Sequence, residues 1–419
     1  MVRKSKKKKT KTAEKVSAIV SILILITAWW FGGVKLSENQ LATLNSLTGE
    51  NQTLVKVEEN LYQVLENDVS VSWLGIGQGI GYGGEIEVAV RIDNQGEINQ
   101  ISILSIKDTS SYITKVIEHG FVDKFFSFSA NEPADVDAVS GATISSTGML
   151  NAFNSSIELI GTKVSGQRKR EKYNPLSTVS ILDAVAIILF ITAIYVSRSV
   201  SKHKTKMQWI LMLSALGVLG FYSASLISTS TLSILISGSW IHGLGNYTPL
   251  ILFILTIGYI LLFNKNIYCQ MICPMGTTQQ CLSKLTNAKT VSLKHKVFVW
   301  FPRFLLLITL AGGLYFRNPT SFSYTPFGIM FSMVGSIYLF IPTILILLTS
   351  LVVHRPWCKT LCPINAMTDY ILFFKDWYKQ LIKPLKKRNK KRSKAMPDKK
   401  SKTYTPTPSA ATNTEDVQS

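Results

Sequence analysis

The hydrophobic pattern of the chain is dominated by six apolar segments separated by polar or basic ones. They are residues 16–34, 180–197, 208–228, 249–263, 297–315 and 335–353. A bilayer core of about 30 Å is crossed by about 20 apolar residues of α-helix, with some variation. We therefore expect a membrane protein whose main part is an α-helical six-span bundle.

Between the first two apolar segments the pattern changes. From Ser37 to about Asn67 it is helical and polar, which predicts a stalk over residues 37–72. Residues 85–92 and 98–106 then alternate with period two on either side of a Gly-containing turn, as the strands of a β-hairpin do. We expect these strands to belong to a folded domain over residues 73–165.

Charge is distributed unevenly between these parts. The whole chain carries +20, yet residues 37–173 hold 18 acidic and 10 basic side chains. The basic tracts flank apolar segments, so a membrane protein with an exported acidic domain explains them better than nucleic-acid binding. Alternation of the spans places the Lys/Arg-rich loops 198–206 and 265–296 inside, as the positive-inside rule expects, whereas residues 168–172 form a basic stretch outside.

The two ends of the chain are also basic. Residues 1–15 are Lys-rich and precede a transmembrane anchor at 16–36, which we interpret as retained because no small-residue cleavage site follows it. Residues 371–419 begin as a basic segment that suits the anionic inner leaflet and end as a disordered Thr/Pro/Ser-rich tail. We expect a multi-pass protein of a bacterial plasma membrane with both termini in the cytoplasm.

A hydroxyl-rich motif, Asp137-Ala-Val-Ser140-Gly141-Ala142-Thr143-Ile-Ser-Ser, lies inside the predicted exported domain. Small residues permit a tight turn, and the segment that follows is typical of the start of an amphipathic helix. Such a helix start attracts anions through its free N–H groups and its dipole. A capped helix without a ligand is the plain alternative.

The full motif resembles the flavinylation motif of FMN-binding domains, as in the covalent-flavin subunits of the Rnf and Na⁺-translocating NADH:quinone reductase complexes. The resemblance covers about residues 73–160 and implies an α+β FMN-binding domain. It also implies that a flavin transferase esterifies the FMN phosphate to Thr143, with Asp137, Ser140, Gly141 and Ala142 around it. The segment expected near the flavin ring departs from the family pattern, and Asp108 and Thr109 are carried over from it as cofactor-binding residues.

All five cysteines lie between Cys269 and Cys362. Four of them form two C-x-x-x-C-P strings, Cys269/Cys273 and Cys358/Cys362, which stand 89 residues apart and indicate a parallel internal repeat. Positions i and i+4 share a helix face, so each string can present two thiolates. Four thiolates suit zinc or an iron–sulfur cluster, and the cluster is favoured because a flavin elsewhere gives electrons a destination.

Three further side chains are of types that can bind a metal or haem: Cys281, His242 and His354. Cys281 is interpreted as structural or free. His242 and His354 are expected near opposite membrane faces and so cannot both ligate the iron of one haem. We therefore interpret them as interfacial residues.

The paired strings resemble NosR/NapH-type membrane ferredoxins over residues 177–370, which implies a 4Fe-4S membrane domain. Members of that family usually carry an additional cytoplasmic ferredoxin domain, and this chain lacks its cysteine strings. We therefore expect electrons from a separate donor (a ferredoxin, flavodoxin or NADH dehydrogenase). The expected acceptor is an extracytoplasmic reductase or a smaller electron acceptor.

These inferences predict a transmembrane electron-transfer component, not a stand-alone enzyme, and they assign no catalytic residue. The alternative is a flavin-bearing membrane sensor with a structural zinc site. A core of about 30 Å separates the predicted sites, too far for one efficient electron hop. We expect a raised cluster below a pocket formed by residues 234–243 and 327–335, and a flavin domain docked through Trp240 and its neighbours. A quinone or second flavin in that pocket is the other solution.

Overall fold

The computed structural model describes residues 2–49, 51–108, 110–128, 133–164, 180–238, 240, 244–290, 296–318, 320, 322–326, 330–331 and 337–395. The chain divides into two compact units, Met1–Leu372 and Phe373–Ser419. Both the sheet and the cysteine strings belong to the first unit. In the second unit, the described residues continue the helix α13, Pro363–Ala395.

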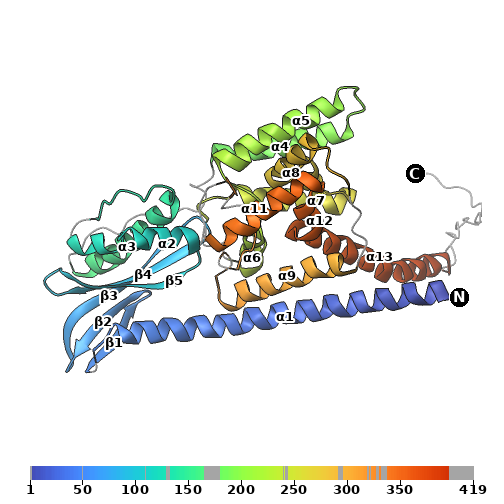
Figure 1. Cartoon of the computed structure of the whole chain (residues 1–419). Helices are drawn as coiled ribbons and strands as arrows, with labels where there is room; N and C mark the ends of the chain where they lie inside the picture. The colour runs from blue at the N-terminus through green and yellow to red at the C-terminus, as the bar shows by residue number, and fades with distance from the viewer. Residues whose placement is uncertain are drawn as a thin grey trace, which may run out of the picture. The chain divides into compact units, whose positions relative to one another are not determined.

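The first helix, α1 (Val2–Ser46), is followed by a five-stranded antiparallel sheet in the order β1-β2-β3-β4-β5. The strands are β1 (Gln52–Glu58), β2 (Leu61–Glu66), β3 (Val69–Ile80), β4 (Glu85–Asp93) and β5 (Ile98–Ile106). They run side by side in chain order (Figure 1). The predicted hairpin is confirmed as β4 and β5.

The expected helical stalk is wrong beyond Ser46, because residues 52–66 form two strands that extend the sheet. Turn chemistry explains the difference. Asn67 and Asp68 both have positive φ, as a type I′ hairpin turn requires, and Asn60 has positive φ in the preceding turn. Asn and Asp tolerate this conformation because their side chains hydrogen-bond the local backbone.

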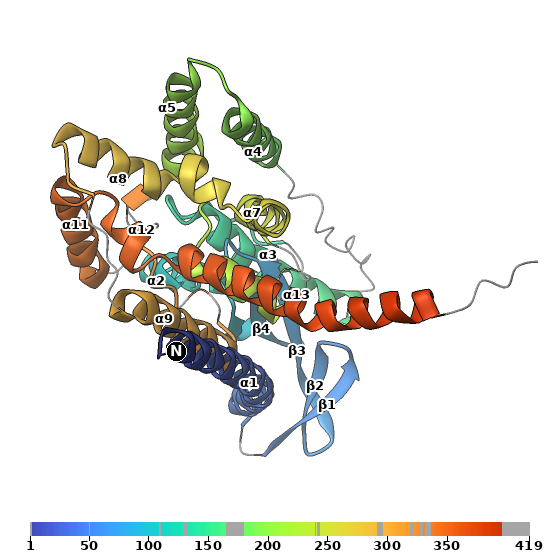
Figure 2. The ribbon, with the colours of Figure 1, turned by 90° about the vertical axis from the view of Figure 1, so that its right-hand side faces the viewer.

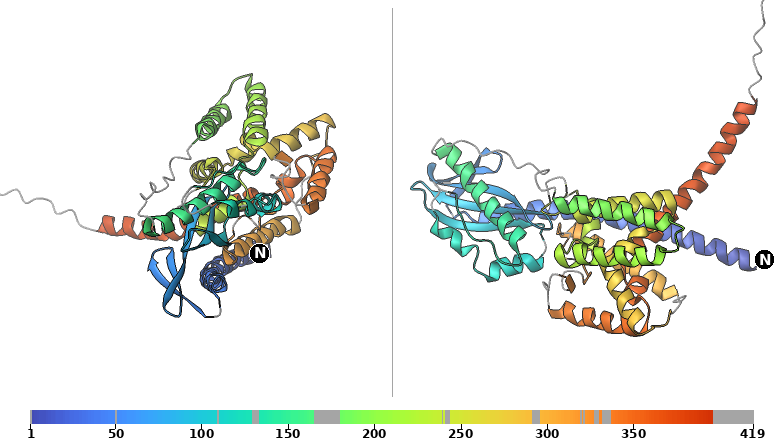
Figure 3. Two further views of the ribbon diagram at one scale, coloured as in Figure 1. Left: turned by 90° about the vertical axis from the view of Figure 1, so that its left-hand side faces the viewer. Right: turned by 90° about the horizontal axis from the view of Figure 1, so that it is seen from above.

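Three helices complete this domain: α2 (Ser110–Glu118), the 3₁₀ helix η1 (Asp123–Ser127) and α3 (Thr143–Val164). The predicted amphipathic helix is thus confirmed as α3, which lies along the sheet (Figure 3). Gly77 and Gly79 make this close approach possible, since a Cβ on either would stand 1.9 Å from a carbonyl oxygen of α3. Alternate glycines leave one face of β3 flat, and this contact fixes where α3 begins.

The remainder of the first unit is helical. Its elements are α4 (Ile181–Arg198), α5 (Lys204–Ala215), the π-helix η3 (Leu216–Tyr222), α6 (Thr229–Ser237), α7 (Thr248–Phe263), the π-helix η5 (Tyr268–Ile272), α8 (Pro274–Leu285), α9 (Lys296–Tyr315), α11 (Ile337–Val352) and α12 (Pro356–Thr360). Helices α4 and α5 lie side by side, as Figure 2 shows.

Among the described residues, three helical segments are long and apolar enough to cross a membrane: Thr12–Ser46, Ile181–Arg198 and Val297–Tyr315. Two shorter apolar helical segments, Thr248–Phe263 and Phe340–Val352, accompany them. Helix α1 packs along α9, where Gly32 is so close to Leu314 that a Cβ would stand 2.3 Å from its carbonyl oxygen. The Lys35 ammonium lies over the ring of Phe316 at 4.6 Å from its centroid.

Candidate functional site

The hydroxyl-rich motif forms a tight turn closed by its last serine. The amide of Ala142 donates to the carbonyl of Val139 at 2.9 Å, and Gly141 has φ +76°, a conformation that favours glycine. The buried Ser146 hydroxyl accepts the Val139 amide at 3.0 Å and lies 3.1 Å from the Ala142 carbonyl oxygen. These bonds hold the turn against the first turn of α3.

Thr143 is the first residue of α3, and its side chain is exposed. Its hydroxyl is therefore accessible, and the unpaired amides of a helix start favour an anion nearby. The Lys115 ammonium lies 2.7 Å from where a Cβ on Gly141 would stand, so the missing side chain leaves room for this cation. The buried Ser145 hydroxyl has no hydrogen-bond partner within the described structure. An accessible hydroxyl beside a cation and a helix start fits an FMN phosphate.

The other predicted residues of this site differ in their surroundings. Asp137 and Ser140 are exposed, and Ala142 is buried. Asp108 is fully buried: its Oδ1 accepts the Gly83 amide at 2.5 Å, and its backbone carbonyl accepts the hydroxyl of Thr320 at 2.6 Å. In this structure Asp108 stabilises the turn between β3 and β4. Thr109 lies outside the described residues.

The sheet domain contacts the helical domain beside the turn between β3 and β4. The Gly245 amide donates to the Gly81 carbonyl at 3.2 Å, and Asn318 donates to the Ile106 carbonyl at 3.0 Å. A Cβ on Gly245 would stand 2.5 Å from Cγ2 of Ile144, the residue after Thr143. The described contacts thus run through these residues and not through Trp240, which is 40% exposed.

Tyr82 lies at the centre of these contacts. Burial raises the pKa of its hydroxyl above the usual range, with a smaller contribution from Tyr112, whose ring centroid lies 5.2 Å away. The hydroxyl pairs with Asn246 and lies 3.5 Å from the Ala224 carbonyl oxygen. The hydroxyl therefore stays protonated and serves as a hydrogen-bonding group between the two domains.

The two cysteine strings have the same local geometry. The Cys273 amide donates to the Tyr268 carbonyl at 2.9 Å, and the Cys362 amide donates to the Trp357 carbonyl at 3.0 Å. Each of these cysteines precedes a proline that begins a helix, α8 or α13. The Cys273 sulfur also accepts from the amides of Met275 and Gly276, as Cys362 does from those of Ile364 and Asn365.

The fold brings the two strings together. The thiols of Cys269 and Cys362 are in hydrogen-bonding contact, and Cys273 and Cys358 interact electrostatically with Cys362. No three His, Cys, Asp or Glu side chains of the described structure converge as ligands of one metal ion would. A four-iron cluster spreads its bonds over four metal atoms, so its ligands need not converge on one point. Four thiols, of which one pair is in contact and the others interact electrostatically, therefore fit such a cluster.

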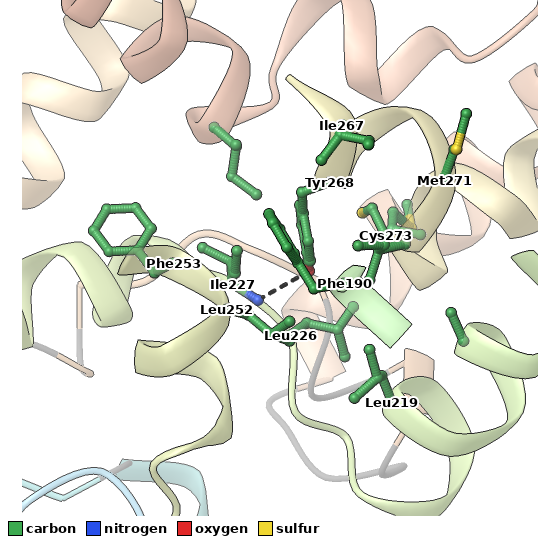
Figure 4. Packing of buried hydrophobic residues seen from close by; sticks show 14 of the residues in the cluster. Phe190, Leu219, Leu226, Ile227, Leu252, Phe253, Ile267, Tyr268, Met271 and Cys273 are labelled. Carbon is green, nitrogen blue, oxygen red and sulfur yellow. Dashed lines mark hydrogen bonds between the residues drawn. The ribbon is translucent and has the colours of Figure 1, made fainter. Parts of the chain in front are cut away.

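Cys273 and Cys362 are buried, Cys269 and Cys358 are half-buried, and a cation lies beside them. Arg355 donates to the Cys269 carbonyl at 3.2 Å. Burial raises the pKa of the Cys273 and Cys358 thiols, and the positive charge of Arg355 opposes this rise. Tyr268, the residue before Cys269, is fully buried, and its hydroxyl accepts the Ile227 amide at 3.2 Å (Figure 4). Ile227 stands three residues after Ala224, so a short segment links the surroundings of Cys269 to the contact with Tyr82.

Some residues of the two sites were not predicted from the sequence, and some candidate ligands do not contact either site. Lys115, Ser146 and Asn246 come from motifs or loops whose role depends on tertiary contacts, and only Ser146 had a signal, as the last residue of the hydroxyl-rich motif. Cys281 shows an electrostatic contact with Lys284 but none with the other cysteines. His354 donates its amide to the Lys289 carbonyl at 3.1 Å, and His242 lies outside the described residues.

Most of the two segments expected to form a pocket also lies outside the described residues. Of the first, Ile234–Ser237 belongs to α6, and of the second, only Met330 and Phe331 are described.

Comparisons with known proteins match both sites. Residues 81–158 match the model of the FMN-binding domain, and residues 246–291 and 336–383 match that of a 4Fe-4S binding domain. No curated protein and no solved structure matches the chain. The first match contains Thr143, and the second contains both cysteine strings. The chain therefore combines an FMN-binding domain with a 4Fe-4S binding domain in one polypeptide, the fusion that its two motifs predicted.

Proposed function

We propose that the protein conducts electrons across a bacterial plasma membrane, from a cytoplasmic donor to an extracytoplasmic acceptor. The observation that carries this proposal is the contact between the FMN-binding domain and the loops that lead to the cysteine strings. When bound, an iron–sulfur cluster supplies one-electron chemistry, and a flavin supplies one- or two-electron chemistry. The polypeptide positions both groups and excludes water from the first.

Four cysteines are proposed to hold the cluster: Cys269, Cys273, Cys358 and Cys362. Their thiols interact with one another, amides at two helix starts donate to two of the sulfurs, and Arg355 adds a positive charge. Burial raises the pKa of the Cys273 and Cys358 thiols, whereas the N–H groups and the nearby cation oppose this rise and favour the thiolate, the form that binds metal. The equivalent geometry at an offset of 89 residues supports the parallel repeat.

Thr143 is proposed to hold the FMN as a phosphate ester made by a flavin transferase. The exposed hydroxyl, the helix start and the neighbouring Lys115 support this assignment. A topology of six spans with both termini inside would place this residue outside the membrane and the cysteines nearer the cytoplasm. The three long and two shorter apolar helices support membrane association.

The link through Tyr268 and Ile227 supports the raised position of the cluster. Tyr268 precedes the first ligand directly, and its hydroxyl meets a segment that ends at the FMN-binding domain. Three residues span at most about 10 Å of chain. This short segment between the hydroxyls of Tyr82 and Tyr268 supports a cluster that is raised toward the FMN-binding domain.

One preparation tests both assignments. The full chain is produced with a flavin transferase, purified in detergent without air, and analysed for iron, sulfide, zinc and covalent flavin. Iron with labile sulfide supports the conduit, whereas zinc supports the alternative, a flavin-bearing sensor with a structural metal. In the variant Thr143→Val, which nearly keeps the volume, the denatured band should lose its flavin fluorescence. A fluorescent variant would refute the assignment of Thr143.

A further inference from the structure

A cation, Lys115, lies beside the hydroxyl-rich turn that is proposed to carry the flavin, and it belongs to another helix. Lys115 lies in the last turn of α2, and its side chain is half-buried. Its ammonium nitrogen stands 2.7 Å from the point that a Cβ on Gly141 would occupy. Any other residue at Gly141 would therefore displace the lysine. The turn needs glycine for its φ of +76° as well, so one residue serves two requirements.

This lysine has no acidic partner. Within the described structure its ammonium makes no hydrogen bond or ion pair, although this region of the chain has more acidic than basic side chains. By contrast, Lys107, which follows the edge strand β5, pairs with Glu85 at 2.6 Å. An unpaired ammonium held beside a glycine turn is available for an anion that the polypeptide itself does not provide.

Two other features near the turn favour the same kind of ligand. Thr143 begins α3, so the first amides of that helix lack intrahelical acceptors. The Ser145 hydroxyl, also in this first turn, is 1% exposed and has no partner in the described structure. Thr143 thus begins a helix whose first turn contains an unpaired hydroxyl, and it stands two residues after the glycine beside which the Lys115 ammonium lies.

We propose that Lys115 is the positioning residue for the flavin, and that its ammonium binds the phosphodiester that esterification leaves on Thr143. This proposal rests on the covalent attachment proposed above. In the attachment step, the Thr143 oxygen bonds to the phosphorus of an activated flavin nucleotide. The leaving group departs with the electron pair of the broken P–O bond, and the hydroxyl proton passes to solvent or the transferase. The product keeps one anionic phosphate oxygen, which matches the single charge of Lys115.

The contact restrains the flavin through its phosphate. A flavin joined only by a flexible ester would rotate about several single bonds, whereas an ion pair at the phosphorus fixes the first of them. Lys115 therefore limits the orientations in which the flavin ring can meet the docked helical domain. Because the site is partly exposed, salt should weaken this ion pair.

Chemical labelling of lysines tests the contact directly. The detergent-solubilised full chain, flavinylated or carrying Thr143→Val, is treated briefly with acetic anhydride, and labelling is read by peptide mass spectrometry. Lys115 should react about tenfold more slowly in the flavinylated chain, the factor that a charge-assisted hydrogen bond would give. Lys124, an exposed lysine of the same domain, should react equally in both. High salt should remove most of the protection if the phosphate charge causes it.

Fluorescence anisotropy of the bound flavin supplies a second readout. Lys115→Gln should let the flavin move faster, Lys115→Arg should restore the slow motion, and Lys124→Gln should change nothing. Equal labelling of Lys115 with the adduct verified on Thr143, or protection that salt does not change, would overturn the proposal. If no adduct is found on Thr143, the attachment site itself is wrong, and the role of Lys115 falls with it.

Discussion

The two cofactor sites of this chain are built in opposite ways. The hydroxyl-rich turn proposed to carry the flavin is continuous in sequence, has an exposed Thr143, and is held by hydrogen bonds between residues at most seven positions apart. The cysteine site is largely buried and joins two segments that stand 89 residues apart. The difference teaches that the first site can be changed one residue at a time, whereas the second depends on the packing of the whole helical domain.

The largest expected effect concerns the cysteines. If one cluster bridges both strings, changing Cys269, Cys273, Cys358 or Cys362 to Ala should each remove all the bound iron, because every ligand is shared. Iron and sulfide analysis of the purified variants measures this. Cys281→Ala serves as the matched control and should keep its iron. Half the iron in a single variant would instead indicate two independent sites.

The second prediction tests whether the two domains fold independently of each other. Gly77→Val should unfold the FMN-binding domain, because its Cβ would stand 1.9 Å from the Ala152 carbonyl oxygen and push α3 from the sheet. Covalent flavin and proteolytic resistance of the domain should both be lost, with iron retained. Gly96→Asn, in an open hairpin turn, is the control and should change little. Loss of iron along with flavin would show that the domains fold as one.

The third prediction concerns the contact between the domains. Gly245→Val should separate them without unfolding either, because the new side chain would collide with Ile144. Flavin and iron contents should stay near those of the wild type, while proteolysis at the contact increases. Gly258→Val tests whether any bulky substitution has this effect, since a Cβ there meets nothing within 4 Å. Unchanged proteolysis in Gly245→Val would argue against the docked arrangement.

The fourth prediction concerns a variant that weakens the hydroxyl-rich turn but keeps Thr143, the proposed attachment residue. Ser146→Ala leaves the buried Val139 amide without a partner, which costs about 1–3 kcal/mol. We expect slower flavinylation by the transferase and a lower melting temperature of the FMN-binding domain, with unchanged iron. Ser127→Ala, at an exposed serine that bonds only its own turn, is the comparison variant. Normal flavinylation rates in Ser146→Ala would show that the turn is held by its other contacts.

The smallest effect expected is a pH dependence. Burial raises the pKa of Glu87, although Lys107 and hydrogen bonds from Gln78 and Gln40 oppose the shift. A raised folded-state pKa means that the protonated form is favoured on folding. The contribution of Glu87 to stability should therefore be fully present below the usual pKa of 4.5 and be lost as pH rises through the folded value. Glu87→Gln should flatten this dependence in a thermal melt, and an unchanged slope would assign it to other groups.

By itself the sequence determined the local features. Period-two alternation predicted β4 and β5, the hydroxyl-rich motif predicted the start of α3, and the two motifs predicted both domains. These succeed because strand pleat, helix start and ligand spacing are set by residues close together in the chain. The strands at residues 52–66 were missed although their positive-φ asparagines and aspartate carried a signal.

Only the tertiary structure decided which distant residues meet. Lys115 stands beside Gly141, Asn246 meets Tyr82, and the thiol of Cys269 meets that of Cys362. No local pattern marks these pairs, because each depends on the angle at which one element crosses another. The close approach of α3 to β3 sets that angle in one domain, and the packing of the apolar helices sets it in the other.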